Sequence, residues 1–366
     1  MERLSFEKIF YHRRHLDDVL GRPERAFPIH LELGLTNFCN HDCAFCYAAQ
    51  SKFSAESGRR RTEIPAERLF AIVQEMREWG LLSVNMVGSG EGMLHSDFVA
   101  IVERIRRMGV ELGIFTNGSN VKGAVARAIV DNLTFVRFSL TGATTKVHKK
   151  AQGVGGFYGV LANIDDLVRL RGGKKTPTIG IQFILTDYSA GDLFRAIEIA
   201  GDLGVDYFQI KPVFPQRGRD GCDNGLELDN ALQLVNRAKE LQNERLKIYI
   251  KPEQMRIVSE NITDRCYRKC LGSCTTTVLE ADLNLYVCSN QKVAEFCLGN
   301  LGERSFEELW LSQERRRLLA GIDVNNCPAA CRMDPLNIIY DKINKGQLAI
   351  PDQLPEPTVG SHVNFL

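Results

Sequence analysis

The chain has 366 residues, 44% of them hydrophobic, which suits one large domain with a buried core and a smaller appended region. Its 46 basic and 45 acidic residues give a formal charge of +1, so the overall charge does not favour a nucleic-acid partner. The start of the chain is rich in charged residues and lacks the apolar core of a signal peptide. No segment approaches the roughly 18 apolar residues of a membrane span. We therefore expect a cytoplasmic protein with neither a membrane nor a nucleic-acid partner.

Eleven cysteines are the most informative feature of the composition. The cytosol keeps thiols reduced, so metal binding explains this number better than a disulfide framework does. One group occupies a short stretch near the start of the chain, a second group occupies the last hundred residues, and Cys222 stands apart from both. The first group is Cys39, Cys43 and Cys46, and the second is Cys266, Cys270, Cys274, Cys288, Cys297, Cys327 and Cys331.

Short β-rich runs alternate with amphipathic helical stretches through the first two thirds of the chain, a pattern typical of repeated βα units and a parallel sheet. Apolar residues spaced three and four apart predict covering helices over residues 66–79, 98–108 and 190–203. The six predicted strands are residues 31–36, 82–87, 111–116, 135–140, 178–185 and 207–213.

Six βα units favour an α/β fold of the partial (β/α)6 TIM-type barrel, with a doubly wound sheet as the alternative. Either fold places the active site at the carboxyl ends of the strands. We expect residues 1–30 to form a helical lead-in and residues 31–250 to form the barrel. Residues 251–366, where cysteines are dense and the alternation stops, are expected to form a small metal-binding domain with a Pro-rich tail.

The first cysteine group begins three residues after the first predicted strand, so it occupies the loop at that strand's carboxyl end. Three thiolates leave one iron of a [4Fe–4S] cluster without a protein ligand, and that iron can bind a small molecule. Structural thiols or part of a zinc site are the alternatives for three cysteines at this spacing.

The CxxxCxxC spacing of Cys39, Cys43 and Cys46 resembles the signature of the radical S-adenosylmethionine (SAM) superfamily. This resemblance implies that the open iron binds SAM and that an electron cleaves it to a 5'-deoxyadenosyl radical. It also implies further contacts to SAM, with an ordinary turn as the alternative for residues 88–91 and Asn117 and a plain strand residue as the alternative for Ser139. They are Gly88, Ser89, Gly90 and Glu91 for the methionine amino group, Phe45 beside the adenine, and Asn117 and Ser139. Gly92 stands where the family usually has a proline after the glutamate.

The second cysteine group surrounds a predicted strand pair over residues 275–287 and resembles the SPASM and Twitch domains of radical SAM enzymes. The resemblance implies an auxiliary [4Fe–4S] cluster closed by four thiolates, with zinc as the structural alternative. The implied ligands are Cys270, Cys288, Cys327 and Cys331, with Cys274 as the chief substitute. Cys266 and Cys297 are expected to be buried thiols, and His41 and His95 to be solvated loop residues.

Cys222 lies in a polar loop after the sixth predicted strand, where it should face the barrel mouth. It resembles the lone cysteine that quenches the substrate radical in radical SAM epimerases, and an incidental loop cysteine is the alternative. Without such a donor, the auxiliary cluster would accept the second electron of a dehydrogenation. Lys211, at the end of the same strand, is expected to anchor a carboxylate or phosphate or to deprotonate a hydroxyl, with solvated charge as the alternative.

The expected substrate is a small molecule such as a sugar or aminocyclitol, because only about thirty residues precede the first strand. A ribosomal peptide is the alternative substrate. The expected electron donor is a flavodoxin or ferredoxin. A non-catalytic iron-sulfur or zinc-binding protein is the alternative from a different functional class.

Overall fold

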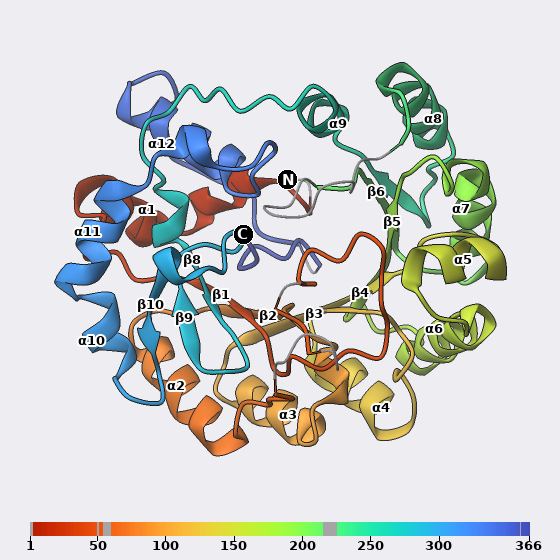
Figure 1. The fold of residues 1–366 in the computed structure, drawn as a ribbon, viewed down its shortest axis with the longest axis horizontal. Helices are drawn as coiled ribbons and strands as arrows, with labels where there is room; N and C mark the ends of the chain where they lie inside the picture. The colour runs from red at the N-terminus through yellow and green to blue at the C-terminus, as the bar shows by residue number, and fades with distance from the viewer. Residues whose placement is uncertain (1–2, 50, 54–59, 215–224, 359) are drawn as a thin grey trace.

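A computed structural model describes residues 3–49, 51–53, 60–214, 225–358 and 360–366. Within these residues one sheet has the strand order β10-β9-β8-β1-β2-β3-β4-β5-β6-β7. Strands β1 to β7 are parallel to their neighbours, β8 is parallel to β1, and the β8–β9 and β9–β10 pairs are antiparallel. The strands curve around the middle of the molecule with helices along the outside (Figure 1).

The six predicted strands are all present, with ends shifted by up to three residues. The strands are β1 (His30–Leu33), β2 (Ser83–Met86), β3 (Glu111–Thr116), β4 (Phe135–Ser139), β5 (Thr178–Ile184), β6 (Tyr207–Lys211), β7 (Lys247–Tyr249), β8 (Thr276–Leu279), β9 (Asn284–Tyr286) and β10 (Cys297–Asn300). The largest difference is at β1, which ends early because the chain leaves the sheet there and Thr36 instead forms an isolated bridge with Glu63.

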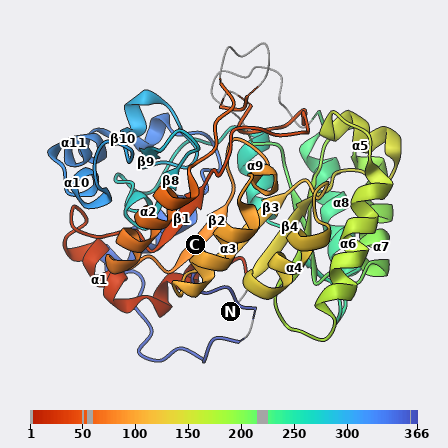
Figure 2. The same cartoon turned by 90° about the horizontal axis from the view of Figure 1, so that it is seen from below.

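Helices follow each strand from β1 to β6, and α2, α3 and α4 lie side by side across the outer face (Figure 2). None of the helices in the described residues is long and apolar enough to span a membrane. The helices are α1 (Arg13–Gly21), α2 (Ala66–Glu78), α3 (Phe98–Arg107), α4 (Gly123–Asn132), α5 (Thr145–Gln152), α6 (Phe157–Arg171), α7 (Leu193–Asp202), α8 (Leu228–Glu240), α9 (Pro252–Ser259), α10 (Phe306–Trp310), α11 (Gln313–Gly321) and α12 (Asp334–Asn344).

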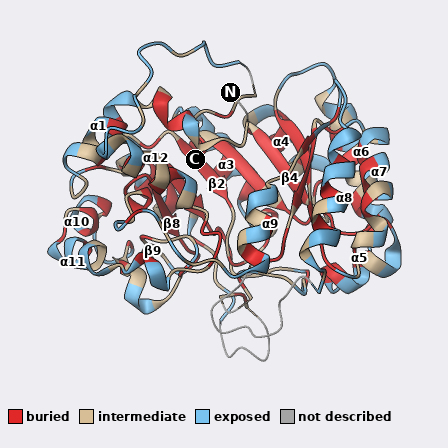
Figure 3. Ribbon diagram, turned by 90° about the horizontal axis from the view of Figure 1, so that it is seen from above, coloured by how far each residue is buried: buried red, intermediate tan, exposed pale blue. Residues whose placement is uncertain are grey.

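The main core lies between the sheet and this outer layer of helices. Along α3, the apolar side chains of Phe98, Ile101, Val102 and Ile105 recur at helical spacing and are all buried. They share one cluster with outward-facing strand residues, and each large apolar side chain buried there stabilises the fold by about 1.5–3 kcal/mol. Figure 3 shows that the strands are buried along their length, whereas each helix exposes one side.

The expected partial barrel of six βα units is confirmed, and the structure adds two features that the sequence did not indicate. A short seventh parallel strand, β7, pairs with β6. The predicted strand pair in the cysteine-rich region is present as β8 and β9, and β8 joins the barrel sheet by pairing with β1. The proposed boundary near residue 250 therefore separates regions that share one sheet, and the division into domains stays a prediction.

Residues 360–366 close the amino ends of the strands. His362 Nε2 lies 2.7 Å from Thr178 Oγ1 at the start of β5, and the Phe365 ring lies 4.9 Å from that of Phe135 at the start of β4. Ser83, the first residue of β2, donates a hydrogen bond to the carbonyl of Asn364. In Figure 1 the end marked C accordingly lies inside the ring of strands and helices. The carboxyl ends of the strands are left as the face where a site can form.

Candidate functional site

The first cysteine group lies in the loop after β1, as the sequence predicts, and its members are Cys39, Cys43 and Cys46. Two backbone N–H groups of this loop donate to the last two carbonyl groups of α5, both at 3.0 Å. Gly153, which follows α5, has a φ of 74°, and a Cβ there would lie 2.2 Å from the carbonyl oxygen of Asp42. The end of α5 therefore forms a close support for the cysteine loop.

The thiols of this loop are close enough to influence one another. Burial, followed by the nearby Glu91 carboxylate, raises the pKa of Cys39 to about 11. Burial also raises the pKa of Cys43, with Cys46 and Cys39 as the next causes, while Lys52 acts in the opposite direction. A bound cation favours thiolates strongly enough to overcome such burial. Three convergent thiols in a half-buried loop thus fit an iron-sulfur cluster better than they fit free thiols.

Gly90 lets the loop after β2 approach the cysteine loop. A Cβ at Gly90 would lie 2.3 Å from the carbonyl oxygen of Phe38 and 2.5 Å from that of Thr36, so a side chain cannot be accommodated without moving backbone. The backbone N–H of Glu91 donates to the same Phe38 carbonyl at 2.8 Å. The glycine here is a requirement of packing beside the cysteines.

The Glu91 carboxylate connects the loops after β2 and β3. It is 4% exposed, and its two oxygens accept hydrogen bonds of 2.8 Å from the hydroxyl of Thr116 and the backbone N–H of Asn117. Burial raises the pKa of Glu91, and these two hydrogen bonds oppose that rise. Glu91 therefore shapes the loop beside the cysteines, and its predicted contact with SAM stays a prediction.

Asn117 joins the β3 loop to the cysteine loop. Its Nδ2 donates to Asn40 Oδ1 at 2.8 Å and lies 3.9 Å from the Sγ of Cys39. Its Oδ1 accepts two hydrogen bonds from Ser119. Asn117 and Glu91, both predicted from the sequence, are thus brought against the cysteines.

Gln152 was not predicted, and it is the most closely engaged polar neighbour of the cysteine loop. This fully buried residue ends α5, and its Oε1 accepts from the Cys43 thiol at 2.9 Å while its Nε2 donates to the Ser139 carbonyl at 2.6 Å. The bridge brings Ser139, at the end of β4, next to the site. Because Gln152 belongs to no local motif, its sequence context gave no signal.

A second unpredicted group links the site to the cysteine-rich region. Ser89 donates to Glu280 Oε2 at 2.7 Å, and Glu280 follows β8 directly. The Lys292 ammonium pairs with Glu280 and lies 5.1 Å from the centre of the Tyr47 ring. Both members of this ion pair are almost inaccessible, so the pair fixes the β8 edge against the loops after β1 and β2.

The remaining predicted residues near the cysteines are Phe45 and Gly88. Phe45 is half-buried between Cys43 and Cys46. A Cβ at Gly88 would lie 2.4 Å from the Cα of Gly34, so this glycine permits two strand ends to touch. Gly92, where the family usually has proline, begins a short 3₁₀ helix, η3 (Gly92–Leu94), that is capped by the Glu91 side chain.

The expectation that His41 and His95 are solvated loop residues is wrong. Both are 5% exposed. His41 Nδ1 lies 3.4 Å from Gln152 Oε1, and His95 Nε2 lies 2.8 Å from the carbonyl of Ile64. Burial lowers the pKa of His41. Both rings therefore serve as buried hydrogen-bonding groups that hold loops.

Four cysteines of the second group influence one another although they are far apart in the sequence, and they are Cys270, Cys288, Cys327 and Cys331. Burial, followed by the charge of Cys270, raises the pKa of Cys288 to about 12 and also raises that of Cys327. Two amides lie close to sulfur, since Asn290 Nδ2 is 3.3 Å from the Sγ of Cys331 and Asn337 Nδ2 is 3.6 Å from that of Cys270. This donor set is compatible with a four-thiolate cluster.

Cys274 has a different environment from Cys270. Its thiol is 1% exposed, donates to the carbonyl of Pro23 at 3.3 Å, and lies 3.7 Å from Nη2 of the buried Arg315. Burial raises the pKa of Cys274 to about 11. Cys266 is exposed, so the expectation that it is a buried thiol is wrong, and Cys297 is half-buried. These surroundings favour Cys270 over Cys274 as a ligand.

Across the described ranges, no three Cys, His, Asp or Glu side chains are close enough to hold a single metal ion. A zinc site needs four ligands around one small ion, whereas the thiols of a [4Fe–4S] cluster surround a much larger body.

Lys211 is at the carboxyl end of β6, as predicted, and Cys222 lies outside the described residues. The Lys211 side chain is half-buried, and burial, followed by the charges of Arg137 and Lys251, lowers its pKa to about 7. Its ammonium lies 5.6 Å from the centre of the Phe214 ring. The alternative for Lys211, a solvent-exposed charge, does not fit these surroundings.

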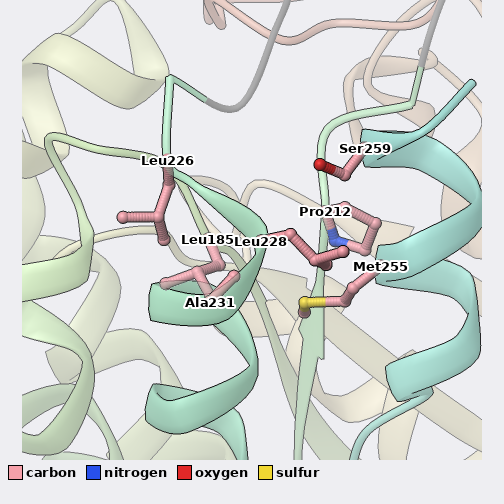
Figure 4. A pocket seen from close by; sticks show the side chains of 7 residues that line it. All are labelled: Leu185, Pro212, Leu226, Leu228, Ala231, Met255 and Ser259. Atoms are coloured by element: carbon pink, nitrogen blue, oxygen red, sulfur yellow. The ribbon is translucent and has the colours of Figure 1, made fainter.

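An apolar pocket lies beside Lys211 but is too small for a substrate. Figure 4 shows its walls, which come from the ends of β5 and β6 and from α8 and α9. Its volume is about 10 Å³, room for about one water molecule. The lining residues are Leu185, Pro212, Leu226, Leu228, Ala231, Met255 and Ser259.

Residues 33–211, which include the first cysteine group and end at Lys211, match the Radical SAM superfamily. The chain therefore contains a radical SAM domain, and domains of this superfamily carry a [4Fe–4S] cluster and SAM. A probable GTP 3',8-cyclase of Thermococcus kodakarensis is 29% identical over 190 residues, which cover 52% of this chain and 57% of that protein. The match thus spans little more than half of that relative.

Two further similarities extend beyond this domain. The tungsten-containing aldehyde ferredoxin oxidoreductase cofactor-modifying protein of Pyrococcus furiosus is 23% identical over 309 residues, 78% of this chain and 81% of that protein. The crystal structure of Streptococcus suis SuiB bound to precursor peptide SuiA has a TM-score of 0.64 at 15% identity, covering 91% of this chain and 76% of SuiB. At that identity the likeness to SuiB is one of fold.

Proposed function

We propose that this protein cleaves SAM reductively at a [4Fe–4S] cluster held by Cys39, Cys43 and Cys46, and that it then removes a hydrogen atom from its substrate. The observation that carries the proposal is the convergence of three thiols in one loop at the carboxyl end of β1, inside the radical SAM domain. When bound, the cluster supplies the electron that cleaves SAM and so generates the radical.

The polypeptide would position the loops around the cluster and SAM and exclude water from them. Gly90 allows two loops to meet, Glu91 fastens the loop after β3 to the loop after β2, and Gln152 supports the cysteine loop from α5. The SAM site would be lined by Phe45, Gly88, Ser89, Gly90, Glu91, Asn117 and Ser139. Such supporting contacts matter because small displacements of a reacting group are costly to rate.

We also propose an auxiliary [4Fe–4S] cluster held by Cys270, Cys288, Cys327 and Cys331. Mutual influence among these thiols, together with two amides beside their sulfurs, supports this set. A cluster with four protein ligands has no open iron, so its role would be electron transfer. The first electron would come from a flavodoxin or ferredoxin in the cytoplasm.

The subsequent reaction on a small molecule would be epimerisation or dehydrogenation. In epimerisation Cys222 would donate a hydrogen atom, and its thiyl radical would be restored by one electron from the flavodoxin or ferredoxin and one proton from solvent. In dehydrogenation the auxiliary cluster would accept the second electron. Lys211 would anchor an acidic group of the substrate or accept a proton from its hydroxyl, because a lysine whose pKa is about 7 can do either near neutral pH. Deuterium incorporation from heavy water separates the two reactions, since a solvent-exchanged thiol delivers deuterium and dehydrogenation adds no hydrogen.

A ribosomal peptide is the second candidate substrate, and the precursor peptide bound to the similarly folded SuiB supports it. Epimerisation of a residue in such a peptide would use the same thiol donor. Mass spectrometry of a candidate peptide after reaction in heavy water would show a gain of one mass unit per epimerised residue.

Anaerobic reconstitution with iron and sulfide tests the proposed function. The expected result is about seven to eight irons per chain and release of 5'-deoxyadenosine when SAM and dithionite are added. A protein that takes up zinc, remains colourless and leaves SAM intact would contradict the proposal and favour a structural metal-binding role.

A further inference from the structure

The inner face of the sheet is polar, in contrast to its helix-covered outer face. Side chains alternate between the two faces of a strand, so Val136, Phe138, Ile181, Phe208 and Ile210 all pack into the outer core. The residues that alternate with these point to the inner face, and the register of neighbouring strands brings them together there. These inner-face residues are Asn85, Phe115, Arg137, Gln182, Gln209 and Lys211.

Arg137 is an inner-face cation that forms no ion pair with a carboxylate of the described residues. It is 7% exposed, its Nε donates to the hydroxyl of Tyr207 at 3.0 Å, and its guanidinium lies 4.3 Å from the centre of the Phe115 ring. Among the ion pairs of the residues that the structure describes, none includes Arg137 or Lys211. Aromatic contacts hold the guanidinium but leave its charge available.

Lys211 extends the same positive region toward the carboxyl ends of the strands. Arg137 contacts Tyr207 at the start of β6, and Lys211 lies four residues further on, about 13 Å along the strand. The two cations are therefore at different depths. They are still close enough that Arg137 lowers the pKa of Lys211, and Lys251 acts in the same direction. Cations are therefore brought together despite their mutual repulsion.

The acidic residues nearby are already engaged. Glu32 pairs with Arg332, Glu280 pairs with Lys292, and Glu91 accepts hydrogen bonds beneath the cysteine loop. None of these carboxylates is paired with Arg137 or Lys211. Within the described residues, these carboxylates therefore leave the charges of Arg137 and Lys211 without an ion-pair partner beside the proposed SAM site.

Unpaired amide groups on the inner face are an independent sign of a ligand. The Oδ1 of Asn85 and the Oε1 atoms of Gln182 and Gln209 are buried and have no hydrogen-bond partner in the described part of the protein. Asn85 is 2% exposed and Gln209 is 5% exposed. Buried polar atoms are normally satisfied, so three of them on one face indicate a polar molecule that supplies the missing partners.

We propose that the inner face binds a polar anionic substrate, with one carboxylate or phosphate held by Arg137 and a second acidic group held by Lys211 nearer the carboxyl ends of the strands. Asn85, Gln182 and Gln209 would pair to its hydroxyl or amino groups. This inference rests on the proposed function, because it identifies the substrate class of the same site. The acidic group at Arg137 is anchored deep in the sheet, which leaves the remainder of the substrate extending toward the carboxyl ends of the strands, where hydrogen abstraction would occur.

Binding of anionic probes to the full chain, reconstituted and loaded with SAM, tests the inference. The probes are inorganic pyrophosphate, citrate and tetraglutamate, titrated calorimetrically at constant ionic strength with chloride as the reference anion. We expect saturable binding of at least one probe. Pyrophosphate or citrate binding favours a free small molecule, whereas binding of tetraglutamate without the other two favours an acidic side chain of a peptide.

Two substitutions connect binding to the proposed residues. Arg137→Gln and Lys211→Gln should each weaken the probe about tenfold to hundredfold, as expected for loss of a charge-assisted hydrogen bond. Lys174→Gln, which removes an exposed lysine paired with Asp131, should leave binding unchanged. If Arg137→Gln fails to fold, Lys211→Gln carries the comparison. Absence of saturable binding, or binding that both substitutions leave intact, overturns the inference.

The readout also separates this inference from the proposed function. Release of 5'-deoxyadenosine is measured on the same preparation. Cleavage of SAM without anion binding overturns the anionic substrate class and leaves the proposed function standing. Anion binding without cleavage, in protein that contains its iron, counts against the proposed function and supports the anion site.

Discussion

The two cysteine groups achieve their arrangement in different ways. Cys39, Cys43 and Cys46 lie within one loop, and their surroundings come from loops after neighbouring strands and from the end of α5. The second group draws on residues 270 to 331, which the chain brings together through β8, β9 and the segment before α12. A local group depends on the support beneath one loop, whereas a dispersed group depends on the whole region, and this difference can be tested.

The largest effect is expected from Gly90→Val. The added side chain would collide with the carbonyl groups of Phe38 and Thr36, so the loop after β2 and the cysteine loop must move apart. A displacement of this kind costs about a hundredfold in rate, which would be measured as 5'-deoxyadenosine release. Gly191→Ala is the control, because a Cβ there meets nothing within 4 Å. Equal cleavage by both variants would show that this close approach is unnecessary.

Cys270→Ala compared with Cys274→Ala examines the dispersed group. Cys270 is grouped with the other three proposed ligands, whereas Cys274 contacts Pro23 and Arg315. Cys270→Ala should lose about four irons per chain, and Cys274→Ala should keep its full iron content. Iron and sulfide assays provide the measurement. Loss of iron in the second variant and retention in the first would exchange the two assignments.

A smaller effect is expected from Gln152→Leu, which in the cluster-free protein removes the bridge between the Cys43 thiol and the Ser139 carbonyl. Losing these buried hydrogen bonds should reduce the free energy of unfolding by about 1–3 kcal/mol. A change in a residue that supports a metal ligand should also lower activity about tenfold to hundredfold. Gln74→Leu on the exposed side of α2 is the matched control. Urea unfolding curves that coincide for both variants would remove Gln152 from the support of the loop.

The last prediction concerns Lys211 and the pH dependence of stability. Its pKa in the folded protein is about 7, below the ordinary value of 10.5, so the unfolded chain binds more protons between these two values. This lysine therefore makes the folded protein more stable as pH rises from about 7 to about 10.5. Lys211→Met should remove that contribution and flatten the profile of unfolding free energy over this window. A profile that stays parallel to that of the wild type would show that Lys211 is not desolvated.

Local patterns in the sequence were sufficient for the parallel strands, the first cysteine group and the position of Lys211. Each depends on residues close together in the chain, such as an apolar run followed by closely spaced cysteines. β7 was missed because it has three residues and begins with an exposed lysine. The pairing of β8 with β1 joins residues more than 240 positions apart, and no local pattern indicates it.

The supporting residues of the site were also invisible to pattern reading. Gln152 and the Glu280–Lys292 ion pair act through contacts that exist only after the strands are assembled. Arg137 has the alternating position of an inner-face residue, yet its proposed role depends on the lack of a carboxylate partner among the described residues, which only the assembled sheet reveals. Sequence therefore indicated the first cysteine group as proposed ligands, and structure was needed to show which residues support its loop.

The most direct test is a triple variant with alanine at positions 39, 43 and 46, reconstituted without oxygen beside the wild type. We predict that it retains about four irons, held by the second cysteine group, and releases no 5'-deoxyadenosine from SAM under reducing conditions. Cleavage of SAM by this variant at the wild-type rate would contradict the assignment of these three thiols to the cluster that activates SAM.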